Sequence, residues 1–155
     1  MCVPYNYMVN YMGTHSVTQV RQNGKPLVTV YTQYDGYLAG VGSSIAKAFL
    51  TENPDPENVK YWSTFNDAQN LAAVVFAYIM ESNIFHSEKV GTVVRGYNVY
   101  VVPDNDLNYY CSVPYTYIID SDENANKITI TVNGGTPMTP EEFTLFVKEN
   151  TRAWA

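Results

Sequence analysis

Apolar and polar residues alternate in two short runs near the start of the chain. Residues 15–21 and 27–34 are rich in β-branched and aromatic side chains, and Asn23-Gly24 lies between them. Asn-Gly favours the tight turn of a β-hairpin because both residues tolerate a positive φ. Period-two spacing puts Val28, Val30, Thr32 and Tyr34 on one face of the second strand. The pattern therefore predicts a β-hairpin with two distinct faces.

Helical spacing dominates the middle of the chain. Residues 66–82 place apolar side chains on nearly every side of a helix, with Asn66 as the expected cap. A helix that is apolar nearly all round is expected to be buried. A shorter helix is expected over residues 45–50, after Ser43 or Ser44. A third begins at Thr139-Pro140, because threonine caps and Glu142 completes a capping box.

Four further segments read as strands: 92–95, 97–102, 109–119 and 127–132. The last two form a second hairpin across residues 120–126. Hairpins joined by tight turns predict an α+β fold, an antiparallel β-sheet of hairpins with about three helices packed on one face. Residues 12–155 are expected to form a single domain, and residues 1–11 an N-terminal extension.

Charge and cysteine usage narrow the classes of partner. Fifteen Asp and Glu outnumber nine Lys and Arg, giving a net charge of −6, and the basic residues are scattered. Nucleic-acid and anionic-membrane binding both need clustered cations, so neither is expected. No run reaches the roughly 18 apolar residues of a membrane span. Cys2 and Cys111 are expected to be free thiols in a reducing cytosol, since a secreted scaffold usually carries more cysteines.

The segment after the first hairpin is the strongest candidate for a site. Gln33, Asp35 and Tyr37 alternate at the end of the strand and offer an amide, a carboxylate and a phenol for hydrogen bonding. Gly40 and Gly42 follow, just before a helix, where backbone N–H groups can bind an anion. The alternative is a tight connection whose glycines serve positive φ angles, with Asp35 bonding its own backbone.

Catalytic and metal-binding patterns are weak. His15 and His86 are the only histidines. Ser43, His15 and Asp35 would form a triad only if folding brought them together, and no nucleophile elbow is present. No spacing of His, Cys or carboxylates suggests a metal site, and no cofactor is expected. The chain therefore leans away from enzymatic function.

Three motifs occur in order along the chain: Gly13-Thr14-His15-Ser16, residues 31–42 (YTQYDGYLAGVG) and residues 135–143 (GTPMTPEEF). Together they resemble an uncharacterised family of small phage and bacterial proteins. Its members open Met-Gly-Thr-Arg-Ser and continue to Tyr-Arg-Gln-Tyr-Asp-Gly-Tyr-Pro-Ser-Gly-His-Gly. The resemblance spans residues 12 to 149, and the part before residue 43 is the specific part. It implies a viral or mobile-element origin.

The chain also departs from that family's pattern. His15 and Thr32 stand where the family has arginine, Leu38-Ala39 replaces Pro-Ser, and Val41 replaces a histidine. If a family site uses that arginine or histidine, this chain has lost or altered its activity.

These observations predict a viral, phage-like accessory protein in the host cytoplasm that binds a host component, for example to inhibit a defence system. A tyrosine-rich, charge-poor surface suits protein recognition. Two alternatives stay open: a virion component, and a binder of a small polar ligand such as a nucleotide signal. The ligand hypothesis requires a concave pocket at the strand end. Homo-oligomerisation is left open. The residues expected to bind ligand or partner are Gln33, Asp35, Tyr37, Gly40, Gly42 and His15.

Overall fold

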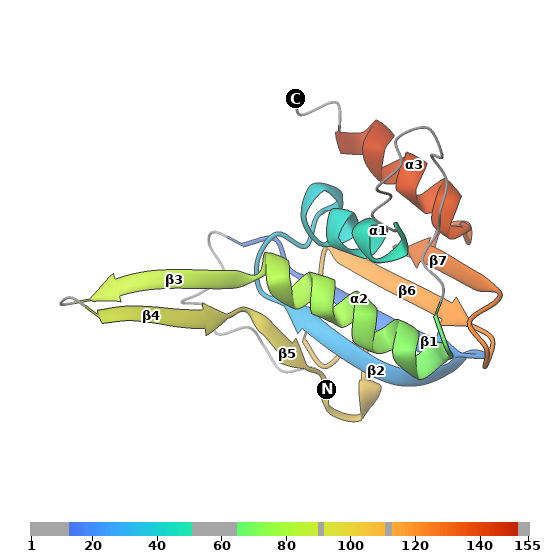
Figure 1. Cartoon of the computed structure of the whole chain (residues 1–155), viewed down its shortest axis with the longest axis horizontal. Helices are drawn as coiled ribbons and strands as arrows, with labels where there is room; N and C mark the ends of the chain where they lie inside the picture. Colours follow the sequence, from blue (N-terminus) through green and yellow to red (C-terminus); the bar gives the residue numbers. More distant parts are fainter. Residues whose placement is uncertain (1–12, 51–64, 90–91, 111–112, 152–155) are drawn as a thin grey trace.

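A computed structural model describes residues 13–50, 65–89, 92–110 and 113–151 (Figure 1). Within them, a five-stranded sheet is covered on one face by three helices, so the predicted α+β class is confirmed. The predicted extension at residues 1–11 and both cysteines lie outside the described residues. No helix in the described ranges is both long and apolar enough to cross a membrane.

The main sheet consists of two hairpins and one edge strand. β1 (Ser16–Gln22) pairs with β2 (Lys25–Thr32), and β6 (Tyr115–Ser121) pairs with β7 (Ile128–Val132). β5 (Val99–Val101) lies beside β2, which gives the order β5-β2-β1-β6-β7. Both hairpins predicted from the sequence are therefore present.

The two hairpins join in parallel, which corrects the expectation of a wholly antiparallel sheet. β1 runs beside β6 with Ser16 opposite Tyr115 and Gln22 opposite Ser121. The other neighbouring strands of this sheet are antiparallel. Parallel neighbours need a long crossover, and the helices and strands between β2 and β6 provide it. The sheet is therefore mixed.

The first turn forms as its residues require. Asn23 and Gly24 have φ angles of 48° and 79°, the left-handed region in which asparagine and glycine are favoured. The turn is held from the neighbouring hairpin, because Asn23 N–H donates to the Ser121 carbonyl and Gly24 N–H to the Asp120 carboxylate. This turn therefore helps to fix the two hairpins side by side.

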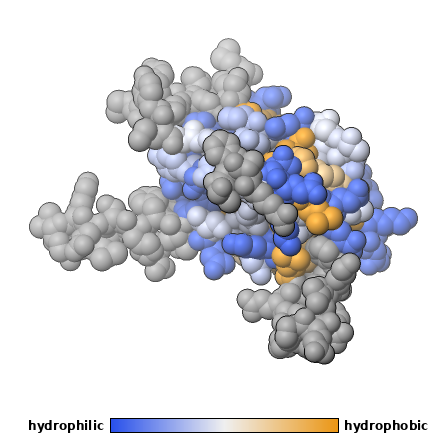
Figure 2. Space-filling view, turned by 90° about the horizontal axis from the view of Figure 1, so that it is seen from above, coloured by the Kyte–Doolittle hydropathy of each residue, from blue (hydrophilic) through white to orange (hydrophobic). Residues whose placement is uncertain are grey.

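Three helices lie on one face of the sheet (Figure 1). They are α1 (Ser43–Phe49), α2 (Ala68–Ser82) and α3 (Pro140–Thr151). α1 contacts both of the others. Buried side chains from all three meet the sheet residues Val20, Tyr117, Ile119 and Ile130 in one core. Seen from above, apolar patches remain among a largely hydrophilic surface (Figure 2).

The helix starts follow capping chemistry, with one correction. Thr139 and Glu142 form the predicted capping box, each side chain accepting from the other's backbone N–H. The cap of α2 is Asp67, whose carboxylate accepts from Asn70 N–H at 2.7 Å, and not Asn66 as expected. A carboxylate at this place also suits the positive end of the helix.

The segment after β5 covers part of the other face. Val102, Leu107 and Tyr110 pack there against Val17 and Tyr31. The Tyr31 and Tyr110 rings are stacked with centroids 4.0 Å apart. The strand expected over residues 109–119 is thus shorter at its start. It begins at Tyr115, and Tyr109 and Tyr110 belong to the segment before it.

β3 (Ile84–Lys89) and β4 (Thr92–Tyr97) form a separate two-stranded ribbon. It extends away from the main sheet (Figure 1). β3 was not expected from the sequence, and the strand expected over residues 97–102 is divided at Asn98 between the two sheets.

Candidate functional site

The loop after β2 is anchored to both hairpins through Gly36. Its N–H donates to the carbonyl of Thr14 at 2.8 Å, and its carbonyl accepts from the hydroxyl of Tyr117 at 2.7 Å. An added Cβ at Gly36 would lie 2.6 Å from the Cβ of Ser16. No side chain fits at this position, because real Cβ atoms do not approach so closely. The loop therefore packs closely against the start of β1 at Gly36.

The glycines of this loop serve close packing and not an unusual backbone angle. Gly36, Gly40 and Gly42 have ordinary φ angles, and the residue with positive φ is Asp35, at 58°. An added Cβ at Gly40 would overlap the carbonyl oxygen of Asp35. The expectation that positive φ explains these glycines is therefore corrected. They allow the chain to fold back on itself before α1.

The backbone N–H groups of the loop are already used. Leu38–Gly42 forms a π-helical turn that continues into α1. Gly40 and Gly42 N–H both donate to the carbonyl of Tyr37, and Val41 N–H donates to that of Asp35. An anion-binding loop needs N–H groups that point toward the ligand. The geometry therefore favours the tight-connection interpretation of Gly40 and Gly42.

Asp35 and Tyr37 form a pair at the surface. The phenol of Tyr37 donates to the Asp35 carboxylate at 3.0 Å. This hydrogen bond is the main reason why the pKa of Tyr37 is raised. Tyr37 is 39% exposed. Its ring is therefore oriented by Asp35 while it stays accessible to a ligand.

Gln33 and His15 belong to a different cluster, on the face opposite the helices. The Tyr31 hydroxyl lies 2.7 Å from His15 Nδ1 and 3.1 Å from Gln33 Oε1. His15 is buried, and burial is the main reason why its pKa is lowered, opposed by a hydrogen bond with the Gln33 backbone. The six expected site residues are thus divided among a surface pair, a tightly packed turn and a buried cluster.

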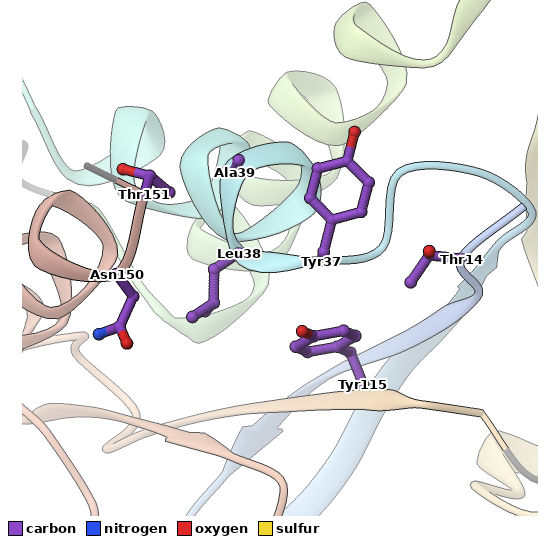
Figure 3. Close-up of a pocket in the computed structure, with 7 residues that line it drawn as sticks. All are labelled: Thr14, Tyr37, Leu38, Ala39, Tyr115, Asn150 and Thr151. Atoms are coloured by element: carbon purple, nitrogen blue, oxygen red, sulfur yellow. The ribbon is translucent and has the colours of Figure 1, made fainter. Parts of the chain in front are cut away.

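A pocket of about 740 Å³ opens beside Tyr37. Its walls come from the loop after β2, from the starts of β1 and β6, and from the last turn of α3 (Figure 3). Of the expected site residues, only Tyr37 lines it. The described lining residues are Thr14, Tyr37, Leu38, Ala39, Tyr115, Asn150 and Thr151.

The pocket combines apolar surface with hydroxyl and amide groups. Asn150 donates its amide N–H to the Phe146 carbonyl at 2.7 Å, which leaves Oδ1 as an acceptor. Tyr37 donates to Asp35 and so offers its oxygen as an acceptor. No hydrogen bond is made by the hydroxyls of Thr14 and Tyr115 to the described residues, so both can donate. No described lining residue carries a charged side chain.

The residues considered for a catalytic triad or a metal site do not come together in the described structure. The hydroxyl of Ser43 donates to the Leu38 carbonyl, while His15 contacts Tyr31 and Asp35 contacts Tyr37. These three residues therefore do not form a catalytic triad. In the described parts of the chain, no three His, Cys, Asp or Glu side chains are grouped as a metal site would require.

Sequence reasoning missed most of the pocket because its walls come from distant segments. Thr14 and Tyr115 meet only because β1 and β6 pair in parallel, and Asn150 joins them through the packing of α3 on the turn.

Comparison with protein-family models, curated proteins and solved structures gives no match to this chain.

Proposed function

We propose that this protein is a non-catalytic binder of a small, uncharged polar ligand, and that the ligand occupies the pocket beside Tyr37. The supporting observation is the pocket itself, of about 740 Å³, at the end of β2. A concave site at this strand end is the feature that separates a ligand binder from a protein that acts only through its surface. The volume lies within the range of roughly 300–1,000 Å³ for small-molecule sites.

The chemistry of the lining favours a planar ligand with both donors and acceptors. Tyr37 and Tyr115 provide aromatic surface, and Leu38 adds an aliphatic side chain. Asn150 Oδ1 accepts, and the Thr14 hydroxyl donates. A nucleobase or nucleoside matches this set. Phosphate groups gain most from Arg or Lys, and the described lining residues include neither.

Paired ligands test both the site and its preference. Nucleosides and their 5′-monophosphates would be compared by thermal shift and calorimetry. A ligand at 100 times its Kd adds about 2.7 kcal/mol to the stability, which raises Tm by roughly 5–10 °C for a chain of this length. We expect a shift with at least one nucleoside and a smaller one with its monophosphate. No shift with any uncharged heterocycle would contradict the proposal.

A pocket-filling variant locates the binding. Ala39 is exposed and lines the pocket, so Ala39→Trp should fill it and abolish binding. Ala73 is an exposed alanine on α2 that does not line the pocket, and Ala73→Trp is the matched control. Equal binding by both variants would place the ligand elsewhere.

The surface pair is tested separately by Asp35→Asn and Tyr37→Phe. Asparagine tolerates the positive φ at position 35, and phenylalanine keeps the ring at position 37. We expect weaker binding with an unchanged Tm. If binding survives in the double variant, Tyr37 contributes only apolar surface to the site.

A second candidate function is recognition of a host protein by a viral accessory protein. The observation that favours it is the exposed edge strand β5, where Val101 is 75% and Tyr100 46% exposed. An edge strand offers unpaired backbone groups to another chain. Affinity capture from a host lysate with the native chain and with Val101→Glu tests this candidate. A partner captured equally by both would not use β5.

A further inference from the structure

Three buried hydroxyls on the helix-covered face of the sheet have no hydrogen-bond partner among the described residues. They belong to Ser16 and Thr18 on β1 and to Thr32 on β2. All three residues have an exposed fraction of 0%. Buried hydroxyl groups in native proteins nearly always have a partner, whether protein or ordered water.

The three residues are neighbours. Ser16 and Thr32 are directly opposite each other in the β1–β2 register, and Thr18 lies two residues further along the same face of β1. Directly opposed Cβ atoms on one face are typically 4.5–5.5 Å apart. Opposed hydroxyls at this spacing can bond directly or share a bridging water, and no direct hydrogen bond joins these three.

The surroundings close the site from the solvent. α2 contacts both β1 and β2, and Gly36 packs directly on the Cβ of Ser16. On the opposite face of the same strands, buried polar side chains do have hydrogen-bond partners. There, Gln19 donates to Thr29 at 2.8 Å, and Thr29 donates to Asn105 Oδ1 at 2.9 Å. By contrast, the hydroxyls of Ser16, Thr18 and Thr32 meet no partner among the described residues.

We infer that these three hydroxyls together bind one ordered internal water between the first hairpin and α2. A buried water typically makes about three hydrogen bonds to otherwise unpaired polar groups, and this cluster supplies three. The water connects β1 to β2 beneath the loop that Gly36 begins. This site is independent of the pocket beside Tyr37 and of any ligand bound there.

Valine substitutions test the inference because valine matches threonine in shape and lacks the hydroxyl. If a water is bound, Thr18→Val and Thr32→Val each remove one of its partners, so each should lower Tm by about 3 °C. The double variant should lose less than the sum, because the remaining hydroxyl no longer retains the water. Single variants that raise Tm, or effects that simply add, would overturn the inference.

Two further measurements complete the test, and the second does not depend on how any variant folds. Thr29→Val removes a hydroxyl that has protein partners. Its decrease in Tm is the reference value for the loss of a hydrogen-bonded threonine hydroxyl. In the unaltered protein, magnetisation transfer from a long-lived water to the methyl groups of Thr18 and Thr32 is expected. No such transfer, together with no solvent density beside Ser16 in a high-resolution crystal structure, would refute the water site.

Discussion

The hydroxyl of Tyr117 donates a 2.7 Å hydrogen bond to the backbone carbonyl of Gly36. Tyr117 is fully buried on β6, and Gly36 lies in the loop between β2 and α1. This bond ties the loop beside the pocket to the second hairpin. Burial also raises the pKa of Tyr117, so its hydroxyl stays protonated at alkaline pH where exposed tyrosines ionise.

Tyr117→Phe should lower the free energy of unfolding by about 1–3 kcal/mol, because the Gly36 carbonyl then remains buried without its donor. Urea denaturation measures the loss. Tyr115→Phe is the matched control on the same strand, since its hydroxyl bonds to no described residue. Similar losses for the two variants would show that the Tyr117 bond adds nothing to stability.

Stability should fall as pH decreases from 7 toward 5 because of His15. Burial lowers its pKa in the folded state, so the unfolded state binds the proton more readily. The stabilisation is therefore fully present above the unfolded pKa of about 6.5 and is lost as pH falls toward the lowered folded value. Urea denaturation across this range measures the slope. His15→Gln should flatten it, while an unchanged slope would assign it to other groups.

Gly40→Ala and Gly42→Ala should differ sharply although both glycines lie in the same turn. A Cβ at Gly40 would overlap the Asp35 carbonyl, whereas one at Gly42 would lie 3.3 Å from the Leu38 side chain. We expect a loss of about 3 kcal/mol for Gly40→Ala and less than about 1 kcal/mol for Gly42→Ala. Denaturation midpoints compare the two. Equal tolerance would mean that the turn relaxes easily.

Thr139→Ala should lower the free energy of unfolding by about 1 kcal/mol through loss of the α3 cap. The Thr139 hydroxyl accepts from Glu142 N–H at 3.2 Å, and Glu142 accepts in return at 3.0 Å. Thr136→Ala, at an exposed position before the helix, provides the control. Thermal unfolding measures both. No difference between them would rule out a contribution from the cap.

Local features of this fold could be predicted from the sequence because short-range chemistry determines them. Asn23-Gly24 specifies its hairpin, and Thr139 with Glu142 specifies a helix start. The position of the α2 cap was predicted one residue too early, because Asn66 and Asp67 are both good caps. Only the observed bond from Asn70 N–H to Asp67 distinguishes them.

Features that depend on distant pairing could not be predicted. Nothing local in Ser16 or Tyr115 indicates that their strands run in parallel. The composition of the candidate site also depends on contacts between distant segments, so it could not be predicted in full. Alternation suggested that Gln33 would lie with Asp35 and Tyr37, but its amide oxygen accepts from Tyr31 on the other face. Tyr37 lines the pocket, but no local pattern places Thr14 or Asn150 beside it.

The parallel junction between the hairpins also affects the order of folding. Each hairpin joins residues close in the chain, whereas Ser16 must find Tyr115, and closing so long a loop is entropically unfavourable. We therefore expect the hairpins to form early and separately, and β1 and β6 to associate late. Until that step, each hairpin exposes a bare strand edge to other nascent chains, and the interval before they join is when this protein is most exposed to aggregation.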